Sequence, residues 1–317
     1  MEGKIRRIRS LLPNTALSML TGKLLGDGNM AIQKTRQPRF RFLHTTHDKE
    51  WCFYCYEQLK SYLPLSAPKY SKTLDTRVKQ GFTESFYVQS YVCEEASLLK
   101  ELWYPDNKKK LPFELIENHL NPLCLAWWYQ DDGHLNTQDG KPKKIILSTD
   151  SFTEIENQTL IQIMKQRFHL TFSLDSQNRL LLYDQSQIYY FLSIVKPFIH
   201  QSMYRKIHIS FQEKTFPPFK RTTIYLPYSL QLNKPTQDIY DSLKLLPMIY
   251  SSLSITSSYH QLFNNVFRSL FPDKRNVKGY QIRLNRHQMV LLDKCQKITG
   301  LQISQLVHLC FIRKKSN

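Results

Sequence analysis

The sequence runs twice through the same order of helices and strands, and this repeat limits the fold more than any other feature. Helical spacing of apolar residues marks the helices, and extended stretches between turn residues mark the strands. The first copy gives a helix at 14–26 with Asn14 or Thr15 as N-cap, strands at 30–34 and 39–45, a helix at 48–63, strands at 69–74 and 82–91, and a helix at 94–103. The second gives a helix at 122–131, strands at 134–136 and 143–148, a helix at 152–168 after an Asp150-Ser151 cap region, two strands that flank Asn178, and a helix at 187–197. Repeats of this kind usually pack about a pseudo-twofold axis.

The repeat divides the chain into four parts. Residues 1–104 form the first repeat, 105–119 a linker with three consecutive lysines, 120–216 the second repeat, and 217–317 a C-terminal region that begins at Pro217-Pro218. Hydrophobic residues make up 41% of the chain and aromatic residues 13%, so it can bury a core. We therefore expect an α+β fold with two pseudo-symmetric repeats and a small C-terminal strand and helix region.

The charge balance favours a nucleic-acid partner. The chain carries 44 Lys and Arg against 26 Asp and Glu, a net charge of +18. This much positive charge repels itself, and binding to a polyanion would relieve the repulsion. A soluble protein that is merely basic remains the alternative.

The cysteines and the N-terminal residues limit the cellular location and the kind of metal site that the sequence predicts. Cys52 and Cys55 lie on one apolar helix face, and no second pair at zinc spacing follows, so we interpret them as core residues in a reducing compartment. No stretch of about 18 apolar residues predicts a membrane span. Residues 1–10 read as a short basic arm rather than a targeting peptide. We expect a protein made where it works, in a chloroplast or mitochondrion, with the bacterial cytoplasm as alternative.

Each motif helix ends in a carboxylate followed by glycine, at Asp27-Gly28 and Asp132-Gly133. A negative charge at a helix C-terminus is unfavourable, and a bound cation would remove the penalty. If the two helices pack side by side, both carboxylates meet, and such a pair either shares a proton or binds a divalent ion. An oxygen-rich site of this kind suits Mg²⁺ and phosphodiester cleavage. One Gly-Asp-Gly could be only a turn, but two copies in matching context indicate a site.

The two helix ends resemble a known motif. They read Leu20-Thr21-Gly22-Lys23-Leu24-Leu25-Gly26-Asp27-Gly28 and Leu125-Ala126-Trp127-Trp128-Tyr129-Gln130-Asp131-Asp132-Gly133. Both resemble the LAGLIDADG motif, and residues 10 to 215 resemble the single-chain, two-motif homing endonucleases. The resemblance implies an αββαββα unit in each half, two saddle-shaped antiparallel sheets that read the DNA major groove, and a monomer that makes a staggered double-strand break at an intron insertion site. It places the metal-binding acids on Asp27 and Asp132, includes Gly26 and Asp131 in the metal site, and implies Mg²⁺, for which Mn²⁺ can substitute.

Two motif positions depart from the family pattern. The third and seventh positions are commonly small, which lets the helices approach closely. The first copy keeps Gly22 and Gly26, but the second has Trp127 and Asp131. Large residues opposite small ones could still interlock. We favour Asp132 over its neighbour as the catalytic acid because it directly precedes glycine, as Asp27 does.

The resemblance also implies a basic residue beside each active centre. Lys109 matches the first by its place before the second motif helix, and Arg205 or Lys206 matches the second, with Lys206 preferred. Their alternative role is phosphate steering or a solvated surface. Further candidate DNA contacts are polar or basic residues on strands and loops of both repeats: Gln33, Arg36, Arg39, Arg41, Lys69, Lys72, Arg77, Lys141, Lys143 and Lys144.

The C-terminal region holds two strand–helix–turn–helix patterns. The first has a strand at 221–227 and helices at 236–246 and 257–270; the second has a strand at 280–284 and helices at 287–298 and 304–313. The second pattern resembles a ribbon-helix-helix DNA-binding unit and the first does so faintly, which suggests a fused pair. Alternation would turn Gln281 and Arg283 toward DNA, with Thr223 and Tyr225 as their counterparts. A helical cap on the catalytic region is the alternative.

Two rival functions stay open. An RNA maturase would bind intron RNA and assist splicing of the intron that encodes it. A catalytically inactive DNA-binding regulator would bind its site in Mg²⁺ without cutting. Histidine offers no further function, because His44 and His47 lie beside a strand end without partners at metal spacing, which favours a surface or core role.

Overall fold

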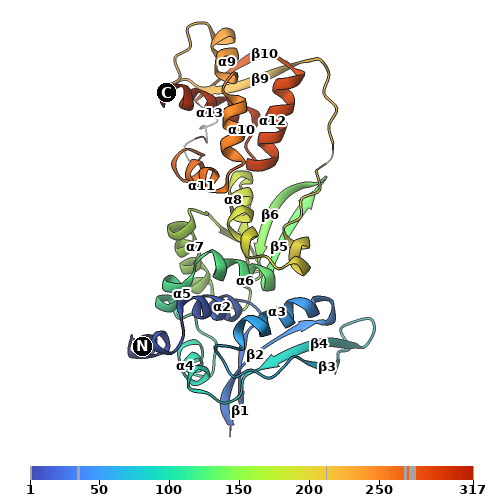
Figure 1. The fold of residues 1–317 in the computed structure, drawn as a ribbon, viewed down its shortest axis with the longest axis vertical. Coiled ribbons are helices and arrows are strands. Elements are labelled where there is room, and N and C mark those ends of the chain that lie inside the picture. The colour runs from blue at the N-terminus through green and yellow to red at the C-terminus, as the bar shows by residue number, and fades with distance from the viewer. Residues whose placement is uncertain (1, 34–35, 212, 268–269, 271–275, 317) are drawn as a thin grey trace. The chain divides into compact units, whose positions relative to one another are not determined.

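The computed structural model describes the whole chain except residues 1, 34–35, 212, 268–269, 271–275 and 317 (Figure 1). The side chains of residues 32, 33, 315 and 316 also lie outside the description, and these include that of Gln33. The chain forms two compact units. The first comprises residues 1–136, 145–182 and 194–208, and the second comprises residues 137–144, 183–193 and 209–317. In the described part of the chain, no helix has both the length and the apolar character that crossing a membrane requires.

The first repeat has the predicted order of elements. These are α2 (Asn14–Leu25), β1 (Asn29–Gln33), β2 (Arg36–Thr45), α3 (Lys49–Leu59), β3 (Lys69–Leu74), β4 (Phe82–Gln89) and α4 (Glu94–Trp103). The strands pair antiparallel in the order β1-β2-β4-β3. Phe40, Phe42 and Val88 are fully buried on one face of this sheet, where β2 contacts α3 and α4. Alternation along β2 therefore places Arg39, Arg41 and Leu43 on the other face.

The second repeat has the same sheet order, β5-β6-β8-β7. Its elements are α6 (Pro122–Asp132), β5 (Gly133–Gln138), β6 (Lys141–Leu147), α7 (Glu154–Phe168), β7 (Ser173–Leu174), β8 (Leu180–Leu182) and α8 (Gln185–Val195). The two matching four-stranded antiparallel sheets confirm the predicted α+β fold with two αββαββα repeats.

Local helix starts differ from the predictions. Pro13 is the N-cap of α2 and makes no side-chain cap, so the prediction of Asn14 or Thr15 was wrong. The cap of α7 is Thr153 rather than the Asp150-Ser151 region. Its side chain accepts from the backbone N–H of Glu156, and the Glu156 carboxylate accepts from the backbone N–H of Thr153. This reciprocal pair satisfies two free N–H groups at the helix start and sets its first residue.

One helix precedes the first repeat, and another lies between the two repeats. The expected basic arm forms α1 (Glu2–Leu11), which buries Ile5 and Ile8 and keeps its arginines exposed. The predicted linker contains α5 (Phe113–His119), which buries Leu115 and Ile116 and packs on α2. These apolar contacts make both segments part of the folded unit.

The C-terminal region also keeps the predicted order. It contains β9 (Phe219–Pro227), α9 (Pro235–Leu243), α10 (Leu246–Leu253), α11 (Thr256–Asn265), β10 (Val277–Asn285), α12 (Arg286–Thr299) and α13 (Ile303–Ser316). The helix predicted at 236–246 ends earlier, at Leu243, and the helix predicted at 257–270 ends at Asn265, with residues 268–269 outside the description. Strands β9 and β10 pair antiparallel over nine residue pairs as a two-stranded ribbon. Gly300 ends α12 with a φ of 68°, a left-handed conformation that glycine adopts at low cost.

Candidate active site

The two motif helices α2 and α6 pack directly against each other. At the third motif position, a Cβ on Gly22 would lie 2.6 Å from the carbonyl oxygen of Cys124 and 2.8 Å from Cβ of Trp127. At the seventh, a Cβ on Gly26 would lie 2.6 Å from Cβ of Asp131. Each glycine of α2 thus makes room for a large residue of α6, which confirms that large and small residues interlock here.

The side chain of Asp131 occupies the space that Gly26 leaves. It is fully buried and receives three donors: Lys23 Nζ at 2.8 Å, Trp51 Nε1 at 2.8 Å, and the backbone N–H of Asp27 at 3.2 Å. Burial opposes the ammonium charge of Lys23, but the charge of Asp131 outweighs it and raises the pKa of Lys23 above its ordinary value. A buried ion pair with several hydrogen bonds therefore joins α2, α3 and α6.

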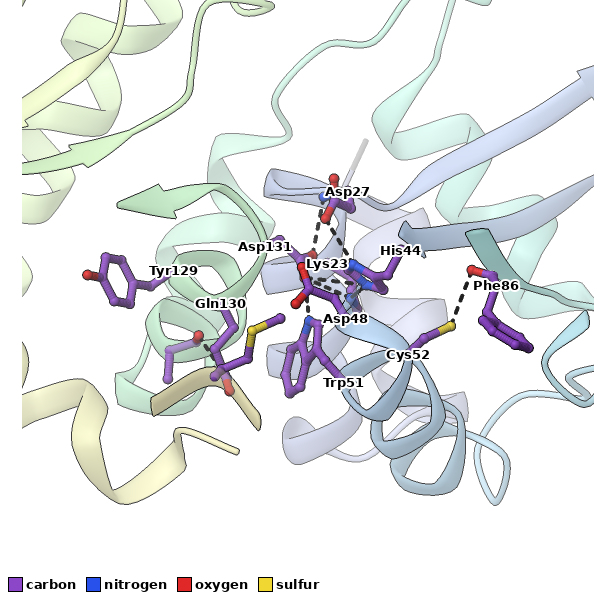
Figure 2. Close-up of polar contacts among 12 residues, drawn as sticks. Lys23, Asp27, His44, Asp48, Trp51, Cys52, Phe86, Tyr129, Gln130 and Asp131 are labelled. Atoms are coloured by element: carbon purple, nitrogen blue, oxygen red, sulfur yellow. Dashed lines mark hydrogen bonds and ion pairs between the residues drawn. The ribbon is translucent and has the colours of Figure 1, made fainter. Parts of the chain in front are cut away.

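His44, at the end of β2, connects this ion pair to Asp27 (Figure 2). Its Nε2 lies 2.7 Å from Lys23 Nζ, and its Nδ1 lies 3.3 Å from Asp27 Oδ2. Burial, and then the charge of Lys23, lower the pKa of His44 well below its usual range, so the ring is neutral. Because an ammonium can only donate, Nε2 must accept and Nδ1 must carry the proton toward Asp27.

The sequence left a surface or a core position open for His44, and the structure buries its side chain. Its contact with Asp27 was missed, because the two residues meet only through the pairing of β2 beside the end of α2. The one available signal was that a histidine follows Phe40 and Phe42 at the same alternation along the strand.

Asp27 and Asp132 interact electrostatically at the paired helix ends. Burial, then the charge of Asp131, raise the pKa of Asp27 to about 6. Burial, then the charges of Asp27 and Asp131, raise the pKa of Asp132 to about 8. The Asp27 side chain is still 38% exposed, so it remains accessible from solvent. Carboxylates this close to one another gain from a bound cation.

Lys206 lies at the C-terminal end of α6. Its Nζ donates to the carbonyl oxygens of Gln130 at 2.5 Å and Asp131 at 2.8 Å. Burial lowers the pKa of Lys206, against the opposing charge of Asp131. Arg205 instead pairs with Asp48 at 2.7 Å. Of the two candidates at this point, Lys206 is the one that contacts the second motif.

Lys109 lies beside the same acids from the linker side. Burial lowers its pKa to about 8, while the charges of Asp132 and Asp27 work in the opposite direction. Its Nζ also lies 5.4 Å from the centre of the Phe152 ring. A half-buried ammonium in this position can balance the charge of a phosphate group.

Two acidic groupings could hold a cation, and they differ in chemistry. Ligand atoms of Asp27, His44 and Asp131 lie within 4.8 Å of one another. However, Lys23 Nζ already contacts both His44 and Asp131, so this grouping contains its own positive charge. Asp27 with Asp132 offers oxygen ligands whose pKa values are raised first by burial and then by neighbouring carboxylate charge. The latter pair fits a hard divalent ion such as Mg²⁺.

Comparison with known proteins identifies the family. The sequence profile of the LAGLIDADG DNA endonuclease family matches residues 17–192, more than half of the chain. The chain belongs to this family. An uncharacterized protein of Methanocaldococcus jannaschii is 30% identical over 60% of this chain and 72% of its own length. The cytochrome b mRNA maturase bI2 of Debaryomyces hansenii is 28% identical over 62% of this chain and 74% of the maturase. The structure of the homing endonuclease I-WcaI bound to its DNA recognition sequence has a TM-score of 0.55 and 19% identity, over 65% of this chain and 93% of that one.

In this LAGLIDADG protein, the first sheet gathers some of the predicted DNA contacts on one face. Arg39 and Arg41 alternate with the buried Phe40 and Phe42, and Lys69 pairs with Tyr87, the residue that pairs with Leu43 on the same face. Lys72 points to the opposite face, where its Nζ lies 3.5 Å from the centre of the Phe82 ring. Arg39, Arg41 and Lys69 therefore form one polar surface, which Lys72 does not share.

The remaining candidates are spread over turns and the second LAGLIDADG repeat. Arg36 is exposed at the start of β2, and Arg77 is held in a turn by Asp75 at 2.8 Å. On β6, alternation places Lys144 on the face opposite the buried Ile145 and Leu147. Lys141 and Lys143 are exposed and lie on the same face as these two residues. The strands thus offer basic side chains to both faces of the second sheet.

Proposed function

We propose that this protein is a site-specific DNA endonuclease that cleaves both strands of an intron insertion site with a staggered cut, as a monomer. The observation that carries the proposal is the meeting of Asp27 and Asp132 at the ends of two packed helices, each with a half-buried lysine nearby. The DNA-bound homing endonuclease of the same fold supports DNA as the substrate. Mg²⁺, or Mn²⁺ in its place, would be held by the carboxylates of Asp27 and Asp132, with Gly26 and Asp131 adjoining.

The residues of this chain divide the work of hydrolysis. When bound, a divalent ion supplies Lewis-acid stabilisation of phosphate charge and a more acidic water. Asp27 and Asp132 supply one oxygen donor from each repeat. A centre that both repeats share suits the cleavage of two DNA strands. Lys109 and Lys206 supply positive charge close to these acids, where an anionic phosphate would need it. The buried contacts of Asp131 hold the two helix ends in place during the reaction.

The test is cleavage of a plasmid library of candidate insertion sites in Mg²⁺ and in Ca²⁺. Wild type should make a double-strand break in Mg²⁺ only. Asp27→Asn and Asp132→Asn should each abolish the break while binding in Ca²⁺ persists, because the amide loses the charge that holds the ion. Lys234→Ala, an exposed lysine of the C-terminal region, serves as the control and should cut normally.

A second candidate is an RNA maturase, which the similarity to the Debaryomyces hansenii maturase favours. Tight binding of the intron transcript with no cut in a library known to contain the intronless site would replace the endonuclease with the maturase. Binding of DNA alone, without a cut, would leave a DNA-binding regulator.

A further inference from the structure

The β9–β10 ribbon has an internal twofold relation that the register reveals. The buried Ile224 and Leu226 of β9 correspond to the buried Ile282 and Leu284 of β10. With this correspondence, Thr223 is equivalent to Gln281, and these two residues pair directly across the ribbon. The pseudo-twofold axis therefore passes through the Thr223–Gln281 pair.

Both edges of the ribbon are closed by side chains of flanking helices. The backbone N–H of Tyr225 donates to Ser304 Oγ at 3.0 Å, and Ser304 lies on α13. The equivalent residue Arg283 donates its N–H to Tyr240 Oη at 3.2 Å and accepts from the same hydroxyl at 2.7 Å, and Tyr240 lies on α9. Neither edge is free at these positions for pairing with a further strand, so a partner would meet the outer face.

The outer face carries two arginines that no described carboxylate neutralises. Arg221 and Arg283 are exposed and pair directly across the ribbon. Like charges directly opposite each other are destabilising. Among the described residues, neither arginine forms an ion pair with a carboxylate, and β9 and β10 contain no acidic residue. The Arg283 guanidinium lies 4.3 Å from the centre of the Phe219 ring, which restricts its orientation.

The other end of the same face differs in chemistry. There Tyr225 pairs with Gly279, and a Cβ on Gly279 would lie 3.2 Å from Cε1 of Tyr225 and 3.3 Å from Cγ2 of Thr223. Tyr225 is 52% exposed. Positions that the pseudo-twofold axis relates therefore present two arginines at one end and an aromatic ring over glycine at the other.

We propose that this outer face enters the major groove of double-stranded DNA, as a second DNA contact separate from the LAGLIDADG sheets. A two-stranded ribbon fits the major groove of B-DNA, whereas the deep, narrow major groove of duplex RNA excludes it. Arginines recognise guanine edges, and apolar groups contact the thymine methyl. The ribbon thus recognises an asymmetric sequence, with guanine at the Arg221–Arg283 end and thymine at the Tyr225 end.

The test selects duplexes from a randomised DNA pool with the full chain carrying Asp27→Asn, which prevents cutting. The same selection is run with Arg221→Ala and Arg283→Ala added, and with the matched pair Lys234→Ala and Lys294→Ala, two exposed lysines outside the ribbon. Loss of both arginines should remove guanines from one end of the enriched motif and weaken binding to the original motif by at least about tenfold, because both guanine contacts are lost. The lysine pair should keep the motif.

An unchanged motif in the arginine variant would overturn the proposal, as would equal loss in the lysine variant or tighter binding of duplex RNA than DNA. The proposal rests on DNA as partner but not on cleavage. If wild type never cuts DNA but its enriched motif depends on the ribbon arginines, the endonuclease proposal is wrong and DNA binding by the ribbon is supported.

A second inference rests on the contacts of His44 and on the proposed metal site. We infer that Lys23 and His44 act as positioning residues for Asp27, because Lys23 fixes the ring tautomer that donates to its carboxylate. His44→Asn keeps a donor near the place of Nδ1, whereas His44→Gln places its amide near Nε2. Mutation of a residue that hydrogen-bonds to a metal ligand typically lowers metal affinity about 10- to 100-fold.

The measurement is Mn²⁺ affinity of the full chain by electron paramagnetic resonance, with single-turnover cleavage beside it. His44→Gln should weaken Mn²⁺ binding about tenfold or more, whereas His44→Asn should keep most of the wild-type affinity. DNA affinity in Ca²⁺ should equal that of wild type in both variants. If wild type binds Mn²⁺ and cuts DNA but the two His44 variants have equal Mn²⁺ affinity, the positioning role alone is wrong. A wild type that binds no Mn²⁺ would overturn this role and the proposed metal site together.

Discussion

The ends of the two motif helices have the same place in the fold but different surroundings. At the seventh motif position the first helix has Gly26 and the second has Asp131, and the two residues face each other. The glycine supplies space, and the aspartate fills it with a buried charge that Lys23 of the first helix neutralises. Pseudo-symmetry of the backbone therefore does not give a symmetric active centre. The contacts that join the repeats are made by unlike residues.

The two candidate catalytic acids differ accordingly. The pKa of Asp27 rises to about 6 and that of Asp132 to about 8, with burial the first cause in both. Asp27 also has the positive charge of Lys23 close by, which holds its pKa down. Asp132 has Lys109 instead, and burial lowers the pKa of that lysine. Without a metal ion, the second half of the site should hold its proton at higher pH than the first half.

The largest effect on stability should come from removing Asp131. Asp131→Ala leaves the Lys23 ammonium buried without its carboxylate and opens a space beside Gly26. Breaking a buried ion pair in this way costs about 3–5 kcal/mol. Urea unfolding of the full chain, followed by near-ultraviolet circular dichroism of the buried tryptophans, would measure the loss.

Adding Lys23→Met to that variant provides the control. The double variant removes both charges and should recover much of the stability, because replacing a whole buried pair is often neutral. If the double variant is as unstable as Asp131→Ala alone, the hydrogen bonds of Asp131 to Trp51 and Asp27 carry the stability instead.

A somewhat smaller loss should follow Gly22→Ala. The new methyl would meet the Cys124 carbonyl oxygen at 2.6 Å, and backbone atoms cannot rotate away as a flexible side chain can. Overpacking of this kind typically costs about 1–3 kcal/mol. Gly3→Ala in α1 is the matched control, because a Cβ there has nothing within 4 Å. Thermal unfolding midpoints that fall equally in both variants would contradict the close approach of α2 and α6.

The repeat, its order of helices and strands and the positions of Asp27 and Asp132 could be predicted because they depend on local spacing and on a motif nine residues long. The ion pair of Lys23 could not. A lysine in the middle of an apolar helix looks solvated until its partner is known, and Asp131 lies in the other repeat. The direction of the Asp131 side chain could not be predicted either, because the residue adjoins Asp132 in the same motif. Its packing against Gly26 and its contacts with Lys23 and Trp51 show that the side chain turns into the helix interface.

The pH dependence of stability should distinguish the two acids. Because the folded pKa of Asp132 is raised to about 8, its contribution to stability is complete below about pH 4 and is lost as the pH rises through 8. The contribution of Asp27 is lost earlier, as the pH rises through about 6. Metal-free wild type should therefore lose stability between pH 4 and 7.5, and Asp132→Asn should lose less.

Thermal unfolding in a chelator, at several pH values in this range, would measure the difference. Lys109 titrates mainly above this range, because its lowered pKa is about 8, so it contributes little to the slope. Parallel curves for wild type and Asp132→Asn would contradict the raised pKa of Asp132.

The smallest effect is expected at Arg205, and it separates the two neighbouring basic residues. The Arg205 side chain is 41% exposed, and its ion pair with Asp48 should be worth no more than about 1 kcal/mol. Arg205→Ala should leave single-turnover cleavage within about twofold of wild type, since this pair lies outside the helix-end contacts. Lys206→Ala should slow cleavage far more, because it removes the ammonium that contacts the carbonyls of Gln130 and Asp131. If Arg205→Ala slows cleavage more than Lys206→Ala does, the basic residue of the second half is Arg205, and the contact of Lys206 with α6 serves only to cap that helix.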